Sequence, residues 1–119
     1  MTKHEVHLKL THQVKTERKI TQEILICIQQ IDATRYFAEL GYASLFDYLT
    51  EYQKYSEGSA QRRISAARLL KELPEVESKL QEGKINLTQL SKLATAIKQE
   101  QKLTGRRVTL QEKKEILLF

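Results

Sequence analysis

Residues that favour turns are scarce in this sequence, whose 119 residues include one proline and four glycines. A β-sandwich or barrel needs a turn after each short strand, and glycine and proline supply many of those turns. The sequence therefore favours helices over these β architectures. Ile20, Ile24, Cys27, Ile28 and Ile31 recur with helical spacing, which predicts one buried helix face.

The N-terminal helical region is predicted over residues 14–40, because Gly41 is a typical helix stop. The residues before it fit two patterns. Val6, Leu8 and Leu10 alternate as in a strand, whereas Val6, Leu10 and Val14 have helical spacing. We favour a helix here.

Two serines are placed as helix N-caps. Ser44 precedes a short apolar helix, with Asp47 three residues later as in a capping box. Ser56 precedes a longer helix that ends near Leu73. Residues 44–73 therefore have the outline of a helix-turn-helix, in which a short helix and a break precede a second helix.

Further helices are predicted in the C-terminal region, residues 74–119. Pro74 suits the first turn of a helix that ends at Gly83. Asn86 is placed as the cap of the next helix and Thr109 as the cap of the last one. We therefore expect one all-α domain over residues 1–119, a compact bundle of about six helices that includes the helix-turn-helix-like unit.

The chain has no pattern that places it in or across a membrane. Its longest apolar run, residues 24–28, is far shorter than the roughly 20 residues that cross a bilayer. The first residues lack an apolar core followed by a small-residue cleavage site, the pattern of a secretory signal. We expect a cytoplasmic protein.

Positive charge is concentrated in the second half of the chain. Residues 1–55 carry seven Lys or Arg and seven Asp or Glu, whereas residues 56–119 carry thirteen Lys or Arg and eight Glu. The formal net charge of +5 therefore belongs to the second half. Such an asymmetry indicates a polyanionic partner, most simply double-stranded DNA, or else a lysine-rich solvated surface.

Signals for catalysis are weak. His4, His7 and His12 lie close together, but no further ligand has a recognisable metal-site spacing. Cys27 has no histidine nearby in sequence, and we expect it to be buried in the helix packing rather than to act as a nucleophile. We find no phosphate-binding loop and no hydrolase or metalloprotease motif. We therefore expect no enzyme activity, metal, cofactor or small-molecule substrate.

The second helix of the helix-turn-helix-like unit supplies the candidate DNA contacts. In that arrangement the N-terminal residues of the second helix approach base edges. The base-side candidates are Ser59, Gln61 and Arg62. A glutamine side chain can form two hydrogen bonds with adenine, and a serine hydroxyl can bind more than one kind of base. The phosphate-side candidates are basic residues on this helix and after it: Arg63, Arg68, Lys84, Lys92, Arg106 and Arg107.

A helical wheel of the same segment predicts an apolar arc that faces inward: Ala60, Ile64, Ala66, Ala67, Leu69, Leu70 and Leu73. It predicts that five polar residues point outward: Gln61, Ser65, Arg68, Lys71 and Glu72. The wheel leaves the roles of two arginines open. Arg62 and Arg63 lie at the rim of the apolar arc, where an aliphatic stem can cover the core while the charged end reaches a phosphate. Alternatively, one of them pairs with a buried acid such as Glu39 or Asp47 and serves packing alone.

Four segments follow one another in a recognisable order: Gly41-Tyr42-x-Ser44-Leu45-Phe46-x-Tyr48-Leu49, Tyr55-Ser56-x-x-x-Ala60-x-Arg62-Arg63-Ile64, Leu73-Pro74-Glu75-Val76 and Gly83-Lys84-Ile85-Asn86-Leu87. Over about residues 14–97, this order resembles the helical region that precedes the nuclease domain in a group of bacterial HNH endonuclease-like proteins. The HNH module, with its histidine-rich metal site and cysteine pairs, is absent from the sequence. The resemblance therefore implies the non-catalytic N-terminal domain of such a protein.

A looser resemblance covers Arg68-Leu69-Leu70-x-x-Leu73-Pro74-Glu75 and the later segment Gly83-Lys84-Ile85-Asn86-Leu87. It is similar to the helix-turn-helix region of ParB-type partition proteins, where such segments follow the helix that reads DNA. Our leading hypothesis is a DNA-binding module. The alternative is a protein-interaction or dimerisation bundle, a homodimer for example, whose apolar ends at residues 6–14 and 116–119 contact the partner.

Overall fold

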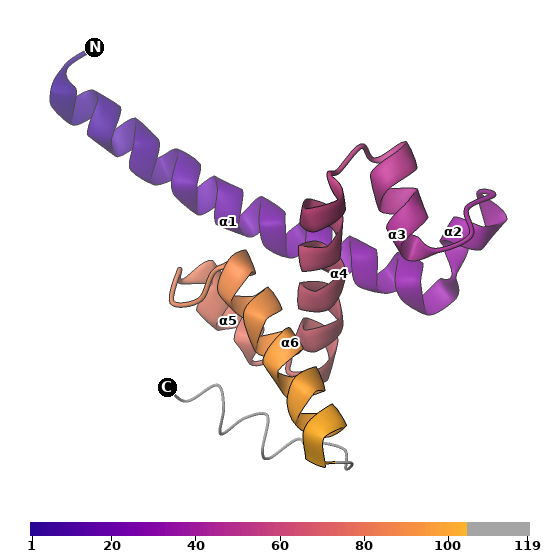
Figure 1. Cartoon of the computed structure of the whole chain (residues 1–119). Coiled ribbons are helices and arrows are strands. Elements are labelled where there is room, and N and C mark those ends of the chain that lie inside the picture. Colours follow the sequence, from indigo (N-terminus) through magenta and orange to yellow (C-terminus); the bar gives the residue numbers. More distant parts are fainter. Residues whose placement is uncertain (105–119) are drawn as a thin grey trace.

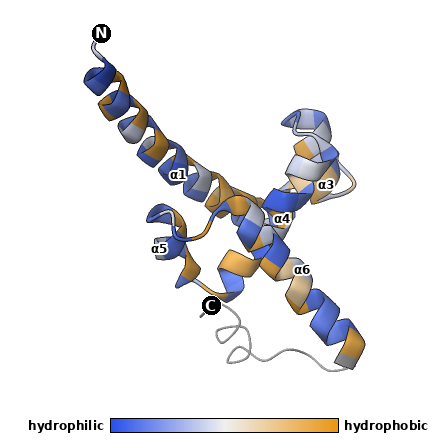
Figure 2. Ribbon diagram, turned by 60° about the vertical axis from the view of Figure 1, so that its left-hand side comes forward, coloured by the Kyte–Doolittle hydropathy of each residue, from blue (hydrophilic) through white to orange (hydrophobic). Residues whose placement is uncertain are grey.

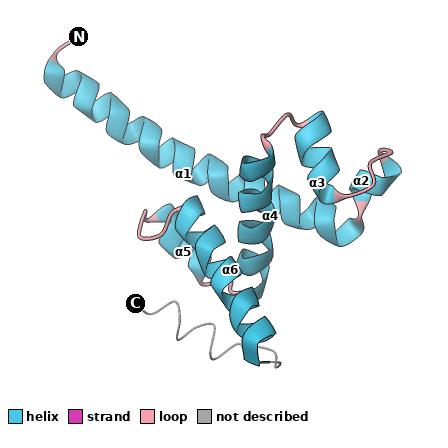
Figure 3. Ribbon diagram, viewed as in Figure 1, coloured by secondary structure: helices cyan, strands magenta, loops and turns pink. Residues whose placement is uncertain are grey.

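The computed structural model describes residues 1–104, which form helices and the short connections between them (Figures 1 and 3). No strand occurs in this part of the chain, so the predicted all-α fold is confirmed. The helix expected after Thr109 lies outside the described residues. In chain order the elements are α1 (Lys3–Thr34), α2 (Tyr36–Glu39), α3 (Leu45–Asp47), the π-helix η1 (Tyr48–Tyr52), α4 (Glu57–Glu72), α5 (Val76–Gln81) and α6 (Leu87–Thr104).

Helix α4 forms the centre of the bundle and packs against α1, α3, η1 and α6. Its inward residues are those that the helical wheel predicts, and all are buried: Ala60, Ile64, Ala66, Ala67, Leu69, Leu70 and Leu73. Ser65, predicted to point outward, is also buried. Small side chains at three of the inward positions let neighbouring helices approach α4 closely.

Helix α1 differs from the predicted region in both of its ends. It begins at Lys3, where the Thr2 side chain accepts a hydrogen bond from the Glu5 backbone N–H at 3.1 Å. It ends at Thr34 because Arg35 adopts a left-handed conformation, with φ of 55°. The break thus comes before Gly41, and a separate short helix, α2, follows. At 32 residues, α1 spans about 48 Å, and its first turns project beyond the bundle (Figure 1).

The bundle covers only part of the predicted face of α1, in which Ile28 is buried and Ile24 and Ile31 pack against the core. Leu25 and Ile28 are buried, together with the polar Gln22. Ile20, by contrast, is 49% exposed, and Cys27 is exposed rather than buried. Apolar residues occupy a wide arc of this helix, and α4 and α5 cover only one side of it. Figure 2 shows hydrophobic positions along the whole of α1, including the part beyond the bundle.

Three predicted N-caps, Ser44, Ser56 and Asn86, are confirmed. The Ser44 side chain accepts a hydrogen bond from the Asp47 backbone N–H at 3.0 Å, although the helix that follows continues as η1. The Ser56 side chain caps α4 through the backbone N–H of Ser59 at 3.1 Å. Asn86 forms a reciprocal capping box with Gln89 at the start of α6.

Helix α5 is shorter than predicted, because Pro74 lies in the turn before it rather than in its first turn. Gly83, with φ of 78°, ends this helix as expected. Within residues 1–104 no helix combines the length and the apolar character that a membrane span requires.

Candidate nucleic-acid interface

The first two turns of α4 carry a group of exposed polar residues. Glu57, Gly58, Gln61 and Arg62 are all exposed there. The Ser56 cap holds the first turn in place, and the preceding connection contains Lys54 in a left-handed conformation, with φ of 67°. The start of α4 therefore presents polar side chains to solvent, while Leu69 and Leu70 near its end are buried in the core.

Two of the three base-side candidates are available to a ligand. Arg62 forms no ion pair within the described residues. The Gln61 side-chain amide donates only a long hydrogen bond, 3.4 Å, to the Ser65 hydroxyl. Both side chains thus retain the groups with which arginine and glutamine recognise base edges.

Ser59, the third base-side candidate, is engaged with Arg63. The Arg63 Nη1 donates hydrogen bonds to the Ser59 backbone carbonyl, at 3.2 Å, and to the Ser59 hydroxyl. The Arg63 guanidinium also lies over the ring of Tyr55, 4.5 Å from its centroid. Arg63 thus braces the connection that leads into α4, and its partners are these two residues rather than Glu39 or Asp47.

Arg68 is tied to α1. Its Nε and Nη2 donate to Oδ2 and Oδ1 of Asp32 at 2.9 and 3.1 Å, which makes a bidentate ion pair. The hydrogen bonds and charge of Arg68 hold the pKa of Asp32 below its usual value of 3.8, and the nearby charge of Lys71 acts in the same direction. Asp32 in turn raises the pKa of Arg68. A phosphate would have to compete with this carboxylate for the guanidinium.

The structure describes two of the other phosphate-side candidates, Lys84 and Lys92. Lys84 forms an exposed ion pair with Glu82, 3.0 Å between Nζ and Oε2. Lys92 is exposed on α6. Arg106 and Arg107 lie outside the described residues.

A groove of about 540 Å³ adjoins the exposed end of α4. Two arginines line it, Arg18 from α1 and Arg63 from α4, together with one acid, Glu17. We call it the arginine groove. Its remaining wall comes from α1, α5 and the start of α6: Val14, Thr21, Leu80, Gly83, Ile85, Asn86, Leu87 and Thr88.

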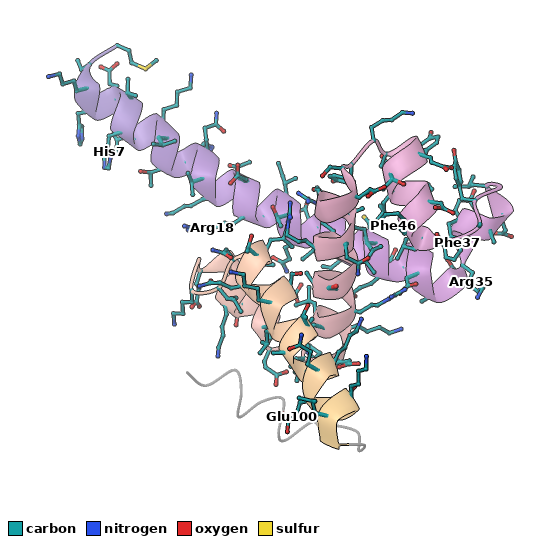
Figure 4. The ribbon with its side chains drawn as sticks, in the orientation of Figure 1. His7, Arg18, Arg35, Phe37, Phe46 and Glu100 are labelled. Carbon is teal, nitrogen blue, oxygen red and sulfur yellow. The ribbon has the colours of Figure 1, made fainter. Side chains whose placement is uncertain are left out.

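Arg18 projects from α1 (Figure 4). Its guanidinium lies beside Gly83, the glycine that ends α5. A side chain at position 83 would place its Cβ 2.6 Å from the Arg18 guanidinium carbon, so only glycine leaves room for this contact. The charge count missed Arg18, because it lies in the electrically neutral half of the sequence. No local sequence signal indicates its role, because 45 residues separate Arg18 from Arg63 and only folding brings them together.

The N-terminal histidines do not assemble a metal site in the described residues. His4 and His7 are neighbours on α1, with ring centroids 6.0 Å apart. No group of three or more potential metal ligands occurs in residues 1–104.

The first two turns of α4 thus offer the amide of Gln61 and the guanidinium of Arg62. The adjoining arginine groove offers the guanidinium groups of Arg18 and Arg63. These donors suit a ligand that carries negative charge and also has hydrogen-bonding groups. No family model, curated protein or solved structure matches the chain. The resemblance to the region before an HNH nuclease domain accordingly stays a prediction.

Proposed function

We propose that this protein binds double-stranded DNA through the first two turns of α4, with the arginine groove receiving a backbone phosphate. The observation that supports this most is the pair Gln61 and Arg62, exposed and free to contact a ligand on a capped helix end. A helix end of this kind fits the major groove, where base edges are accessible.

The proposal divides the contacts between base edges and backbone. Gln61 suits adenine and Arg62 suits guanine, because each can form two hydrogen bonds with that base. Arg18 and Arg63 supply charge for a phosphate, which sets affinity and makes it depend on salt. Glu57 lies in the same first turn, where its carboxylate repels phosphate but can accept a hydrogen bond from cytosine.

The α3–η1 segment, the connection and α4 would then act as a helix-turn-helix, with α4 as the reading helix. In this proposal Arg68 supports the fold, because Asp32 occupies its guanidinium. The protein would position DNA rather than cleave it, as the resemblance to the non-catalytic region of HNH endonuclease-like proteins implies.

Fluorescence anisotropy with a labelled duplex, measured across a salt series, tests the proposal. The decisive comparison is R62Q against K71Q. Both variants lose one positive charge from an exposed position on α4, but Lys71 lies in the last turn. We expect R62Q to weaken binding roughly 5- to 150-fold, equivalent to about 1–3 kcal/mol, and K71Q to leave it nearly unchanged.

Loss of affinity by the same factor in both variants would show that net charge alone governs binding, which contradicts the proposed interface. Absence of binding to the duplex at low salt would refute DNA binding altogether. Circular dichroism of each variant confirms that the fold is retained.

A further inference from the structure

Helix α1 carries an apolar stripe that the described bundle leaves partly uncovered. Its residues repeat at intervals of four and three: Val6, Leu10, Gln13, Glu17, Ile20, Ile24, Cys27 and Ile31. This is the heptad spacing of a coiled-coil seam, interrupted by Gln13 and Glu17. Val6, Leu10 and Ile20 are 51%, 62% and 49% exposed. We call this stripe the α1 seam.

The second half of the α1 seam forms one wall of an apolar groove of about 440 Å³. Tyr48 and Leu49 of η1, with Gln53 and Tyr55 after it, form the opposite wall. Glu23 is the one charged residue that lines it. We call it the α1–η1 groove. An apolar surface of this kind on a water-soluble body marks an interaction site.

The first half of the seam lies on the part of α1 that projects beyond the bundle (Figures 1 and 4). A short helical segment without tertiary contacts, such as this projecting part, is marginally stable in water. Covering Val6 and Leu10 with another apolar surface would therefore stabilise this part of the helix. One helix thus supplies both an uncovered apolar arm and an open apolar groove in the same heptad register.

The geometry points to a second copy of this chain as the occupant: two α1 helices pair in antiparallel orientation, so that the arm of each lies in the α1–η1 groove of the other. In this register the residue numbers of facing seam positions add up to 37. Val6 faces Ile31 and Leu10 faces Cys27. The interface has the two-fold self-complementarity typical of homodimers.

Charge favours antiparallel over parallel pairing. A parallel pair would place the Glu17 residues of the two copies against each other, and like charges at such positions are destabilising. In the antiparallel pair Glu17 faces Ile20.

Analytical ultracentrifugation of the full chain tests the pairing, with a control that the sequence itself offers. Leu8 and Leu10 are 54% and 62% exposed, but Leu8 lies on the other side of α1. We expect the wild type to dimerise, L10E to raise the dissociation constant at least tenfold and L8E to change it less than twofold. A wild type that stays monomeric at about 1 mM, or equal effects of the two variants, overturns the proposal.

Cysteine cross-linking tests the orientation. Under mild oxidation we expect L10C to form disulfide-linked dimers through the native Cys27, whereas L8C and the double variant L10C/C27S do not. Wild type that cross-links through Cys27 alone would show a parallel pair instead. A monomeric wild type whose Cys27 reacts slowly with a thiol reagent would assign the groove to another part of the same chain. Either of these results refutes antiparallel pairing.

Discussion

Asp32 of α1 and Arg68 of α4 form a bidentate ion pair, with donor–acceptor distances of 2.9 and 3.1 Å. The pair joins the helix that carries the α1 seam to the helix that carries Gln61 and Arg62. It therefore connects the helices that carry the two proposed interfaces, and it gives Arg68, a predicted phosphate contact, a partner within the fold.

The Asp32–Arg68 pair predicts a pH-dependent contribution to stability. The pKa of Asp32 in the folded protein is below its ordinary value of 3.8. Stabilisation by the pair is therefore fully present above that ordinary value and is lost as the pH falls through the lowered pKa. Because half of the Arg68 side chain is exposed, we expect D32N to cost no more than about 1 kcal/mol at pH 7.

Urea unfolding of D32N and wild type at neutral and acidic pH measures this effect. The difference between the two proteins should be largest at neutral pH and should shrink below pH 3.8. A difference that stays constant over this range would show that Asp32 does not stabilise the fold through its charge.

A second prediction concerns Gly83 and its contact with Arg18. G83A introduces a side chain at φ of 78°, which costs about 1–2 kcal/mol, and G41A does the same at φ of 93°. A Cβ at Gly41 meets nothing within 4 Å, whereas one at Gly83 displaces the Arg18 guanidinium. Since the end of a flexible side chain moves easily, we expect similar losses of stability from both substitutions.

The two glycine variants should differ in DNA affinity. G83A moves Arg18 within the arginine groove and should weaken binding to the duplex, whereas G41A should not. Thermal unfolding and anisotropy on the same samples separate the two effects. Equal affinities for G83A and G41A would remove Arg18 from the proposed interface.

The contact between Tyr55 and Arg63 gives a third prediction. The Arg63 guanidinium lies over the Tyr55 ring, so Y55F should retain the cation–π interaction and Y55L should lose it. We expect Y55L to be less stable than Y55F by about 0.5–1 kcal/mol, the strength of such contacts at partly exposed sites. Denaturant titration of both variants checks this, and equal midpoints would mean that the ring contributes only apolar area.

The α4–α6 contact predicts a large effect at Leu90, which is fully buried. L90A should cost about 2–5 kcal/mol, because it removes apolar contacts and leaves a cavity. Leu103 lies on the same helix but is 85% exposed, so L103A should change stability by less than about 0.5 kcal/mol. Calorimetry of the two variants measures the difference, and similar melting temperatures would place α6 outside the cooperative core.

Local sequence signals predicted the helix starts well. Ser44, Ser56 and Asn86 each cap the helix that the sequence assigns to them. These predictions succeed because a capping side chain binds a backbone N–H within three residues. The end of α1 was predicted less well, because Arg35 adopts a left-handed conformation without being glycine or asparagine.

The candidate site was predicted only in part. Gln61 is exposed as the helical wheel predicts, and Arg62, which the wheel places at the rim of the apolar arc, is exposed as well. Arg63 binds Ser59 of its own helix and Tyr55 of the preceding connection, whereas Arg68 pairs with Asp32 of α1. Asp32 lies 36 residues from Arg68 in sequence. No local sequence pattern predicts a contact across such a separation. The same holds for Arg18 and Arg63, which line one groove.

The sequence by itself determined that the described residues are helical, where α3, α4 and α6 begin and which face of α4 is buried. Those properties depend on residue spacing within one or two helical turns. Only the tertiary structure decided which side of α1 is covered, leaving Ile20 and Cys27 exposed, and which cations remain available to a ligand. A wide apolar arc is compatible with several packings, and the one adopted depends on the shapes of α4 and α5, which meet α1 only after folding.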